Sequence, residues 1–156
     1  MTLTKALFPI LILLAIYPAL QRDEPRKCEK LTRAKVVELL GQPVKCKKET
    51  KNVECYGGQY APHTVQFNDS GVVEQLTMFN VCSGVQPLRK EMDRIVPESL
   101  RGKLLKKADL SARGSCQPVN EEEYECVKIK FAQELCMGCS PATITIVWKD
   151  NSDRAK

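Results

Sequence analysis

The chain has 156 residues, with 24 Lys and Arg, 19 Asp and Glu, eight Cys, one His and a formal net charge of +5. Nucleic-acid-binding proteins usually gather basic residues on one face and interleave aromatic ones, whereas the densest basic groups here, 45–48 and 103–107, are diluted by neighbouring acids. A single His also excludes a metal site built from paired histidines. We therefore expect no nucleic-acid partner, no metal and no cofactor.

Residues 1–20 have the pattern of an export signal. One basic residue, Lys5, precedes an apolar run from Leu7 to Ile16. Ten apolar residues are too few for a hydrocarbon core of ~30 Å, which needs roughly 20, but they fit the central region of a secretory signal. Ala15 or Ala19 can precede the cleavage point. We expect a cleaved signal peptide, with a retained anchor as the alternative; only the anchor would place a span in the membrane.

The even number of cysteines predicts a disulfide framework in a secreted or periplasmic protein. The cysteines are Cys28, Cys46, Cys55, Cys82, Cys116, Cys126, Cys136 and Cys139. We expect two local pairs, Cys46–Cys55 and Cys116–Cys126, because each pair flanks a charged loop of a proposed hairpin, where opposite residues bring their Cβ atoms ~4.5–5.5 Å apart. The other four cysteines then pair among themselves in an order that the sequence leaves open.

Residues 31–150 are expected to form one domain, after a charged, flexible lead-in at 21–30 and before a short tail at 151–156. The first helix of this domain is predicted to begin after Thr32, whose hydroxyl can cap its first turn. Gly41 can take the left-handed conformation that ends a helix, and the Pro two residues later cannot continue it.

The remaining elements follow from the period of the apolar residues. Leu88, Met92, Ile95 and Val96 form one stripe of a second helix at 87–96, and a third short helix is predicted within 100–110. Two-residue alternation and turn residues predict the strands. These strands are 44–47, 52–56, 64–68, 72–79, 116–119, 124–131 and 143–149. The expected fold class is therefore α+β, with short helices packed on an antiparallel sheet and stapled by disulfides.

The two halves of the domain, 31–82 and 87–150, follow a similar order. Each half runs helix, Cys, loop, Cys, and then a small residue, Pro, any residue, Thr and an aliphatic residue, at 61–65 and 140–144. This order suggests two tandem helix-plus-sheet units. A chance similarity within one domain is the alternative.

Part of the first half resembles a known family. A capped helix ends in Leu-Gly-Gln-Pro at 40–43, Tyr56 lies in the next strand, and Val-Gln-Phe, a turn, Gly71 and two valines follow at 65–73. This pattern is similar to that of the small protein A/outer membrane lipoprotein A (BamE-like) envelope family, and to the β-lactamase inhibitory proteins, which repeat such a unit twice. The resemblance implies short helices on an antiparallel sheet and a role in envelope assembly or protein binding. Cys28 does not directly follow the signal segment, unlike the lipidated Cys of that family.

Three features suggest chemistry but also fit a structural role. Cys136-Met137-Gly138-Cys139 is a C-x-x-C motif, which opens a helix in thioredoxin-like enzymes; here Ser-Pro and a predicted strand follow, which favours a structural role. His63 is interpreted as an exposed loop residue, with no Gly-x-Ser-x-Gly nucleophile motif in the chain. Glu121–Glu123 is interpreted as the solvated tip of a hairpin.

The binding candidates are Tyr56, Gly57, Gly58 and Tyr60, because Tyr offers a large stiff surface with a polar end and Gly lets a loop follow a partner. A Gly-Gly turn beside a packed Tyr is the alternative. We expect an exported, non-enzymatic binding or inhibitor-like module whose partner is another protein or an envelope component. The alternatives are a cell-envelope assembly or maintenance factor, and a thiol–disulfide oxidoreductase that uses the C-x-x-C motif.

Overall fold

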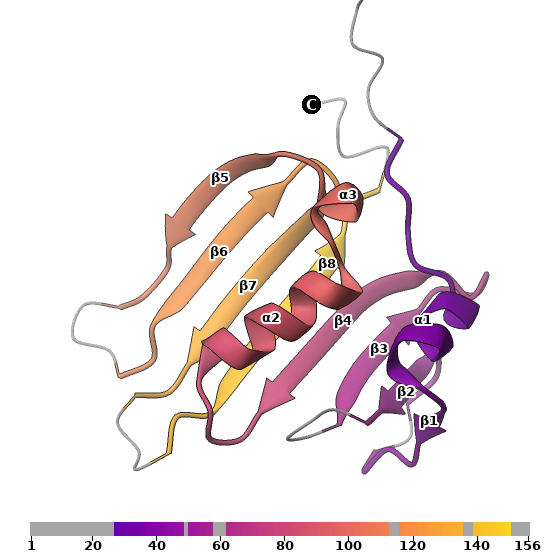
Figure 1. Cartoon of the computed structure of the whole chain (residues 1–156), viewed down its shortest axis with the longest axis horizontal. Coiled ribbons are helices and arrows are strands. Elements are labelled where there is room, and N and C mark those ends of the chain that lie inside the picture. The colour runs from indigo at the N-terminus through magenta and orange to yellow at the C-terminus, as the bar shows by residue number, and fades with distance from the viewer. Residues whose placement is uncertain (1–26, 49, 58–61, 113–115, 136–138, 151–156) are drawn as a thin grey trace, which may run out of the picture.

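The structure is a computed structural model that describes residues 27–48, 50–57, 62–112, 116–135 and 139–150. The predicted signal segment 1–20 and tail 151–156 lie outside these residues. One antiparallel sheet has the strand order β1-β2-β3-β4-β8-β7-β6-β5, and the helices lie on one of its faces (Figure 1). The elements are α1 (Arg33–Leu40), β1 (Pro43–Val44), β2 (Val53–Tyr56), β3 (His63–Phe67), β4 (Val73–Asn80), α2 (Val85–Ile95), α3 (Glu98–Arg101), β5 (Leu104–Asp109), β6 (Val119–Tyr124), β7 (Val127–Gln133) and β8 (Ala142–Trp148). The predicted α+β class is confirmed.

The two longer helices form where the sequence predicts them. The hydroxyl of Thr32 accepts a hydrogen bond from the Lys35 N–H at 3.3 Å, which satisfies one of the free donors of the first turn of α1. Gly41, at a φ of 84°, ends this helix by donating its N–H to the Val37 carbonyl. Helix α2 begins at Val85, two residues earlier than predicted, and buries Leu88, Met92 and Ile95 against β4, β7 and β8.

The third predicted helix, at 100–110, is wrong. Helix α3 ends at Arg101 because Gly102 takes a φ of 77°, and the chain continues as the edge strand β5. Leu104 and Leu105 do not point into a core, since they are 42% and 60% exposed. The spacing of apolar residues at 100–110 does not identify a strand because β5 is exposed along almost its whole length. It has no buried face that would impose a two-residue period.

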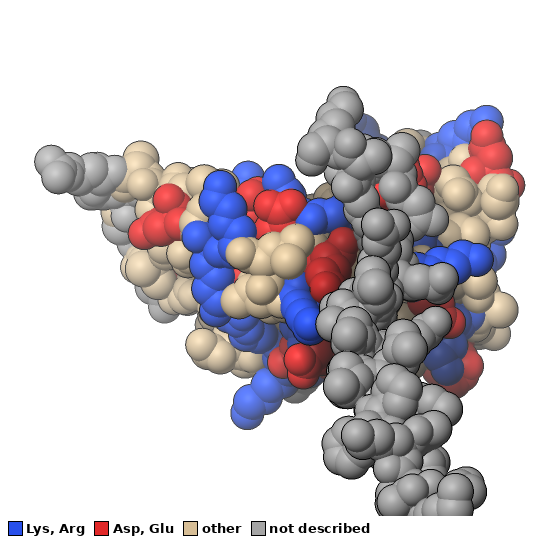
Figure 2. All heavy atoms as spheres, turned by 90° about the horizontal axis from the view of Figure 1, so that it is seen from above, with Lys and Arg blue, Asp and Glu red and all other residues tan. Residues whose placement is uncertain are grey.

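Charged side chains of both signs are interspersed on the end of the molecule seen in Figure 2. The charged pairs of the described residues include Arg101 with Asp93 at 2.9 Å and Lys149 with Glu123 at 2.7 Å. This distribution agrees with the mixed charge pattern of the sequence, and it is not the one-signed face that a nucleic-acid backbone would attract.

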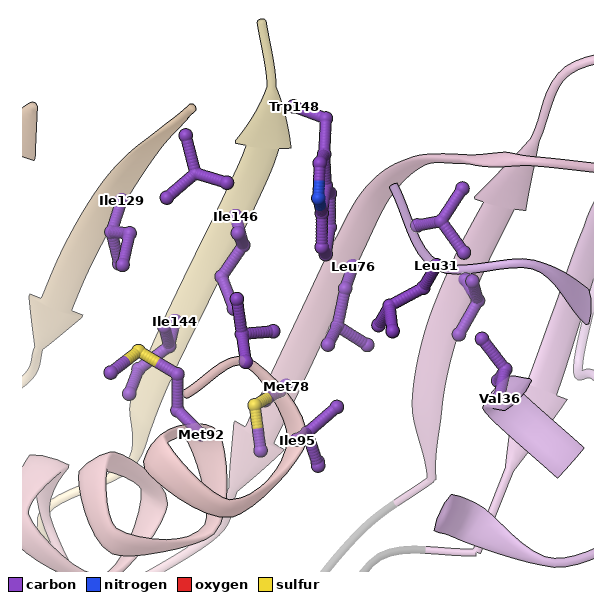
Figure 3. Packing of buried hydrophobic residues seen from close by; sticks show 14 of the residues in the cluster. Leu31, Val36, Leu76, Met78, Met92, Ile95, Ile129, Ile144, Ile146 and Trp148 are labelled. Atoms are coloured by element: carbon purple, nitrogen blue, oxygen red, sulfur yellow. The ribbon is translucent and has the colours of Figure 1, made fainter. Parts of the chain in front are cut away.

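The core lies between the helices and the sheet. Figure 3 shows Met92 and Ile95 of α2 beside Met78, Ile144 and Ile146 of the central strands, all of which are at most 1% exposed. Leu76 of β4 belongs to the same cluster, and Leu31 and Val36 extend it toward the first strands of the sheet. Side chains on these strands alternate between the two faces, so the same strands also present a second face that no described helix covers; we call it the open face.

Three disulfides join described residues: Cys28–Cys126, Cys46–Cys55 and Cys82–Cys139. The predicted local pair Cys46–Cys55 is confirmed. Cys116 is also disulfide-bonded, but its partner lies outside the described residues, as does Cys136.

The predicted pair Cys116–Cys126 is wrong, and Cys28 therefore does not pair within the remaining four cysteines, whereas Cys82 and Cys139 do. The stretch between Cys116 and Cys126 is not a loop but contains the whole of strand β6, six residues that extend the chain by ~20 Å. The two cysteines therefore lie toward opposite ends of the strand. Cys126, 1% exposed, instead meets Cys28 of the N-terminal segment, with a Cα–Cα distance of 5.3 Å.

The disulfides agree with an oxidising extracellular or periplasmic location. Within the described residues, the helices are too short or too polar to cross a bilayer.

Candidate functional site

The open face carries a groove of about 620 Å³ where β2, β3, β4 and β8 approach the loop that follows β1. Its volume lies within the roughly 300–1,000 Å³ typical of small-molecule sites. The described residues that line it are Lys45, Cys46, Lys47, Lys48, Thr50, Val53, Cys55, Pro62, Thr64, Phe79, Asn80, Val81, Pro141, Ala142 and Thr143. We refer to this feature as the groove.

One wall of the groove is the segment Lys45–Lys48, which we call the lysine loop. Strand β1 ends at Val44, opposite Cys55 of β2, so the chain leaves the sheet edge after only two paired residues. The Cys46–Cys55 disulfide then ties the loop to the sheet, with a Cα–Cα distance of 5.3 Å. The loop is thus held over the open face by a covalent bond to the next strand.

The floor of the groove is largely apolar. Phe79 and Val81 are 37% and 53% exposed, which places apolar surface in contact with solvent inside a concavity. Pro62 and Pro141, which precede β3 and β8, add to this surface. Burying such surface under a ligand contributes roughly 25 cal/mol per Å², so this floor favours an apolar body.

The end of the groove is fixed by the turn after β4. The Asn80 side chain is 2% exposed; its oxygen accepts hydrogen bonds from the N–H groups of Cys82 and Ser83, and its amide donates to the Gly84 carbonyl. The Cys82–Cys139 disulfide holds this turn against the segment before β8. Val81 therefore lies on a rigid turn.

Among the described residues, the rim of the groove carries three lysines and no acidic residue. Lys45, Lys47 and Lys48 are exposed, and none of them forms an ion pair with another described residue. None of the described lining residues is acidic. The groove thus combines an apolar floor with a cationic rim.

Two of the predicted binding residues, Tyr56 and Gly57, are described, and neither of them lines the groove. Tyr56 is fully buried on the helix side of the sheet, and its hydroxyl donates to the Glu54 carboxylate at 2.5 Å. Burial, together with that carboxylate, raises the pKa of Tyr56. Gly57 is exposed, while Gly58 and Tyr60 lie outside the described residues. The signal that was missed is the alternation along β2, which places Cys55 on the open face and its neighbour Tyr56 in the core.

The interpretation of His63 as an exposed loop residue is wrong. His63 is 0% exposed in β3, its Nδ1 accepts the Phe79 N–H at 3.4 Å, and its Nε2 lies 3.2 Å from the Glu91 carboxylate of α2. The imidazole is directed toward the helix side, away from the groove. The buried ring thus has one hydrogen bond, at Nδ1, while Nε2 has only the nearby Glu91 carboxylate.

The interpretation of Glu121–Glu123 as a hairpin tip is also wrong, because these residues lie within β6. The Glu122 side chain, 6% exposed, accepts two hydrogen bonds of 2.6 Å from Arg89, one of 2.8 Å from Tyr124 and a 3.0 Å contact from Lys107. Arg89 also lies 4.5 Å from the centre of the Phe131 ring. We call these five residues the Glu122 cluster.

Two opposing effects set the ionisation of this cluster. Burial alone would raise the pKa of Glu122, but the hydrogen bonds from Arg89, Lys107 and Tyr124 outweigh it and hold the pKa at about 2. The cluster is consequently a stable ion pair between α2 and the sheet, with its charges already matched.

The C-x-x-C motif is the other feature that could carry chemistry, and Cys139 is the part of it that lies within the described residues. Cys139 is bonded to Cys82, 57 positions away, rather than to its motif partner. Among the described residues, no group of three or more His, Cys, Asp or Glu side chains is arranged to hold a metal ion. The groove is therefore the candidate site that the geometry supports best.

No protein-family model matches the chain, and neither does any curated protein or solved structure. The resemblance to the BamE-like family and to the β-lactamase inhibitory proteins stays a prediction.

Proposed function

We propose that the protein is an exported, non-enzymatic binding module that takes its ligand into the groove on the open face. The observation that carries this proposal is the exposure of Phe79 and Val81 inside a concavity of about 620 Å³. A folded domain gains nothing in stability from leaving such surface open, whereas a ligand site requires it.

The disulfides support this proposal. Cys46–Cys55 fixes the lysine loop and Cys82–Cys139 fixes the turn that carries Val81, so both sides of the groove are preorganised. A rigid site binds more tightly because less conformational entropy is lost when the ligand enters. The bond from Cys139 to Cys82 also favours a structural role for Cys139 over dithiol catalysis.

We further propose that the sheet consists of two tandem units, 31–82 and 87–150. The first unit has a counterpart of the Glu122 cluster: Arg33 of α1 contacts Glu54 at 2.8 Å and lies 4.6 Å from the Phe67 ring centre, and Tyr56 donates to Glu54. In both units, therefore, an Arg of the helix contacts the Glu of a Glu-x-Tyr sequence and a Phe ring of the next strand, and the Tyr donates to the same Glu.

Strand pairing supports the same division. Glu54 pairs with Val65 in β2 and β3, as Glu122 pairs with Ile129 in β6 and β7. From the two edges the strands run β1 to β4 and β5 to β8, so that β4 and β8 meet in the middle of the sheet. This arrangement is what two copies of one unit joined about a two-fold axis would give.

The proposed binding function is tested with a neutral fluorescent reporter, N-phenyl-1-naphthylamine, titrated into the oxidised protein. We expect saturable binding that Phe79→Gln weakens about tenfold or more, since a large apolar contact worth about 1.4 kcal/mol is lost. The control is Val147→Gln, an exposed residue of β8 that is 42% exposed and does not line the groove. Equal binding by the two variants, or no saturable binding by the parent protein, would contradict the proposal.

A further inference from the structure

We infer that the ligand of the groove is an amphipathic anion, a single aliphatic chain that ends in a carboxylate. This inference rests on the proposed binding function and specifies its ligand class. It follows from the charge of the rim, the nature of the floor and the place of the groove within the sheet.

The charge of the rim is the first step. On the helix side, Arg33, Arg89 and Arg101 each face a carboxylate of this chain at 2.9 Å or less. The three lysines of the lysine loop have no such partner among the described residues, and no described lining residue is acidic. Three like charges on one short loop repel one another, and an anion in the groove would relieve this repulsion.

The floor is the second step. A small hydrophilic anion such as acetate would reach the lysines but leave Phe79 and Val81 uncovered. An aliphatic chain covers them and gains free energy in proportion to the apolar area that it buries. The ligand therefore needs both an apolar body and a negatively charged end.

The place of the groove within the sheet favours a small amphiphile over an extended peptide. A peptide that adds to a sheet needs a free strand edge. Strands β3, β4 and β8, which contribute to the floor, are each paired on both sides. Strand β1, the edge nearest the lysine loop, offers only two residues. A bound chain therefore lies across side chains and makes no main-chain ladder.

The test measures displacement of N-phenyl-1-naphthylamine by decanoate, decanol, decyltrimethylammonium and acetate. We expect decanoate to displace the reporter at a concentration about tenfold or more below that of decanol, because its carboxylate can form several charge contacts with the lysines that a hydroxyl cannot form. The alkylammonium should be weaker than decanol, and acetate should have no effect. Higher ionic strength should reduce the difference between the concentrations of decanoate and of decanol that displace the reporter.

The matched variants are Lys45→Gln/Lys47→Gln/Lys48→Gln and Lys103→Gln/Lys106→Gln/Lys130→Gln. Both remove three positive charges, and the second set consists of exposed lysines outside the groove that form no ion pair among the described residues. The first variant should lower the affinity for decanoate until it is close to that for decanol, and it should leave the affinity for decanol unchanged. The second should retain the preference for decanoate.

The outcomes separate the two proposals. Equal displacement by decanoate and decanol, or loss of the preference in both triple variants, overturns the anionic ligand but leaves a binding groove. Binding to phosphatidylglycerol vesicles without any response to monomeric decanoate overturns it in favour of a membrane surface. Absence of saturable reporter binding in the parent protein removes the proposed function and this inference together.

Discussion

Replacing Glu122 by Gln tests how α2 is held on the sheet. The carboxylate is 6% exposed and accepts two hydrogen bonds of 2.6 Å from Arg89 and one of 2.8 Å from Tyr124, while Lys107 lies 3.0 Å away. The amide has almost the same shape but no charge. The substitution therefore leaves Arg89 and Lys107 without their anion and causes little change in packing.

The expected loss of stability follows from the ionisation of Glu122. Its pKa falls from 4.5 to about 2 in the folded protein, despite the opposing effect of burial, and each unit corresponds to about 1.4 kcal/mol, so the ion pair stabilises the fold by about 3 kcal/mol at neutral pH. A lowered pKa means that this contribution is present above about pH 4.5 and is lost as the pH falls toward about 2. Glu122→Gln should remove it at all pH values.

The assay is urea unfolding followed by circular dichroism between about pH 7 and pH 2. The parent protein should lose about 3 kcal/mol more than Glu122→Gln across the acidic part of this range. The control is Glu54→Gln, at the corresponding position of the proposed first unit, where the side chain is 27% exposed. Its cost should be about 1 kcal/mol, as for a partly solvated pair. Equal costs for the two variants, or an unchanged acid dependence in Glu122→Gln, would refute the reasoning.

Two further predictions concern covalent and backbone constraints. Cys28→Ala/Cys126→Ala should lower the free energy of unfolding by about 4–5 kcal/mol, because this disulfide spans 98 positions. Cys46→Ala/Cys55→Ala should lower it by about 2.5 kcal/mol, because that disulfide spans only 9. Equal losses in urea unfolding would argue against the chain-entropy account of these disulfides. Gly102→Ala should be more destabilising than Gly41→Ala, since both have positive φ but only the added Cβ at Gly102 meets another side chain, Glu125 Oε2 at 2.5 Å. Thermal unfolding that ranks the two variants in the opposite order would contradict this prediction.

The elements that the sequence predicts well are those with a buried face. The stripe of Leu88, Met92 and Ile95 identifies α2 because this helix lies over the middle of the sheet. Strands β7 and β8 alternate cleanly for the same reason. Strand β6 does not, because its inward residue at the centre is Glu122, which is balanced by Arg89 from a helix 33 positions away. A local pattern carries no information about such a distant partner.

The candidate site shows the same limit. Alternation from the buried Met78 places Phe79 on the opposite face, so its exposure follows from the sequence. The confirmed pair Cys46–Cys55 also brings the lysine loop near β2. That this loop, Phe79 and Pro141 surround one concavity depends on β4 pairing with β8, a contact between the two halves of the chain. The sequence alone therefore favours the conspicuous Tyr-Gly-Gly segment at 56–58 as the binding site.

The position of the groove follows from a difference between the two edges of the sheet. Edge strand β5 keeps to β6 over six residues, whereas edge strand β1 pairs with β2 over only two. The chain after β1 is consequently free to turn onto the open face, where Cys46–Cys55 holds it. This bond closes a short loop and contributes little to global stability compared with Cys28–Cys126, but it fixes one wall of the groove. Under conditions where both variants remain folded, Cys46→Ala/Cys55→Ala should accordingly weaken binding of the neutral reporter more than Cys28→Ala/Cys126→Ala does. This order is expected although Cys46→Ala/Cys55→Ala lowers the free energy of unfolding less. If the variant that loses more stability also loses more affinity for the reporter, the groove depends on the sheet as a whole and not on the tethered loop.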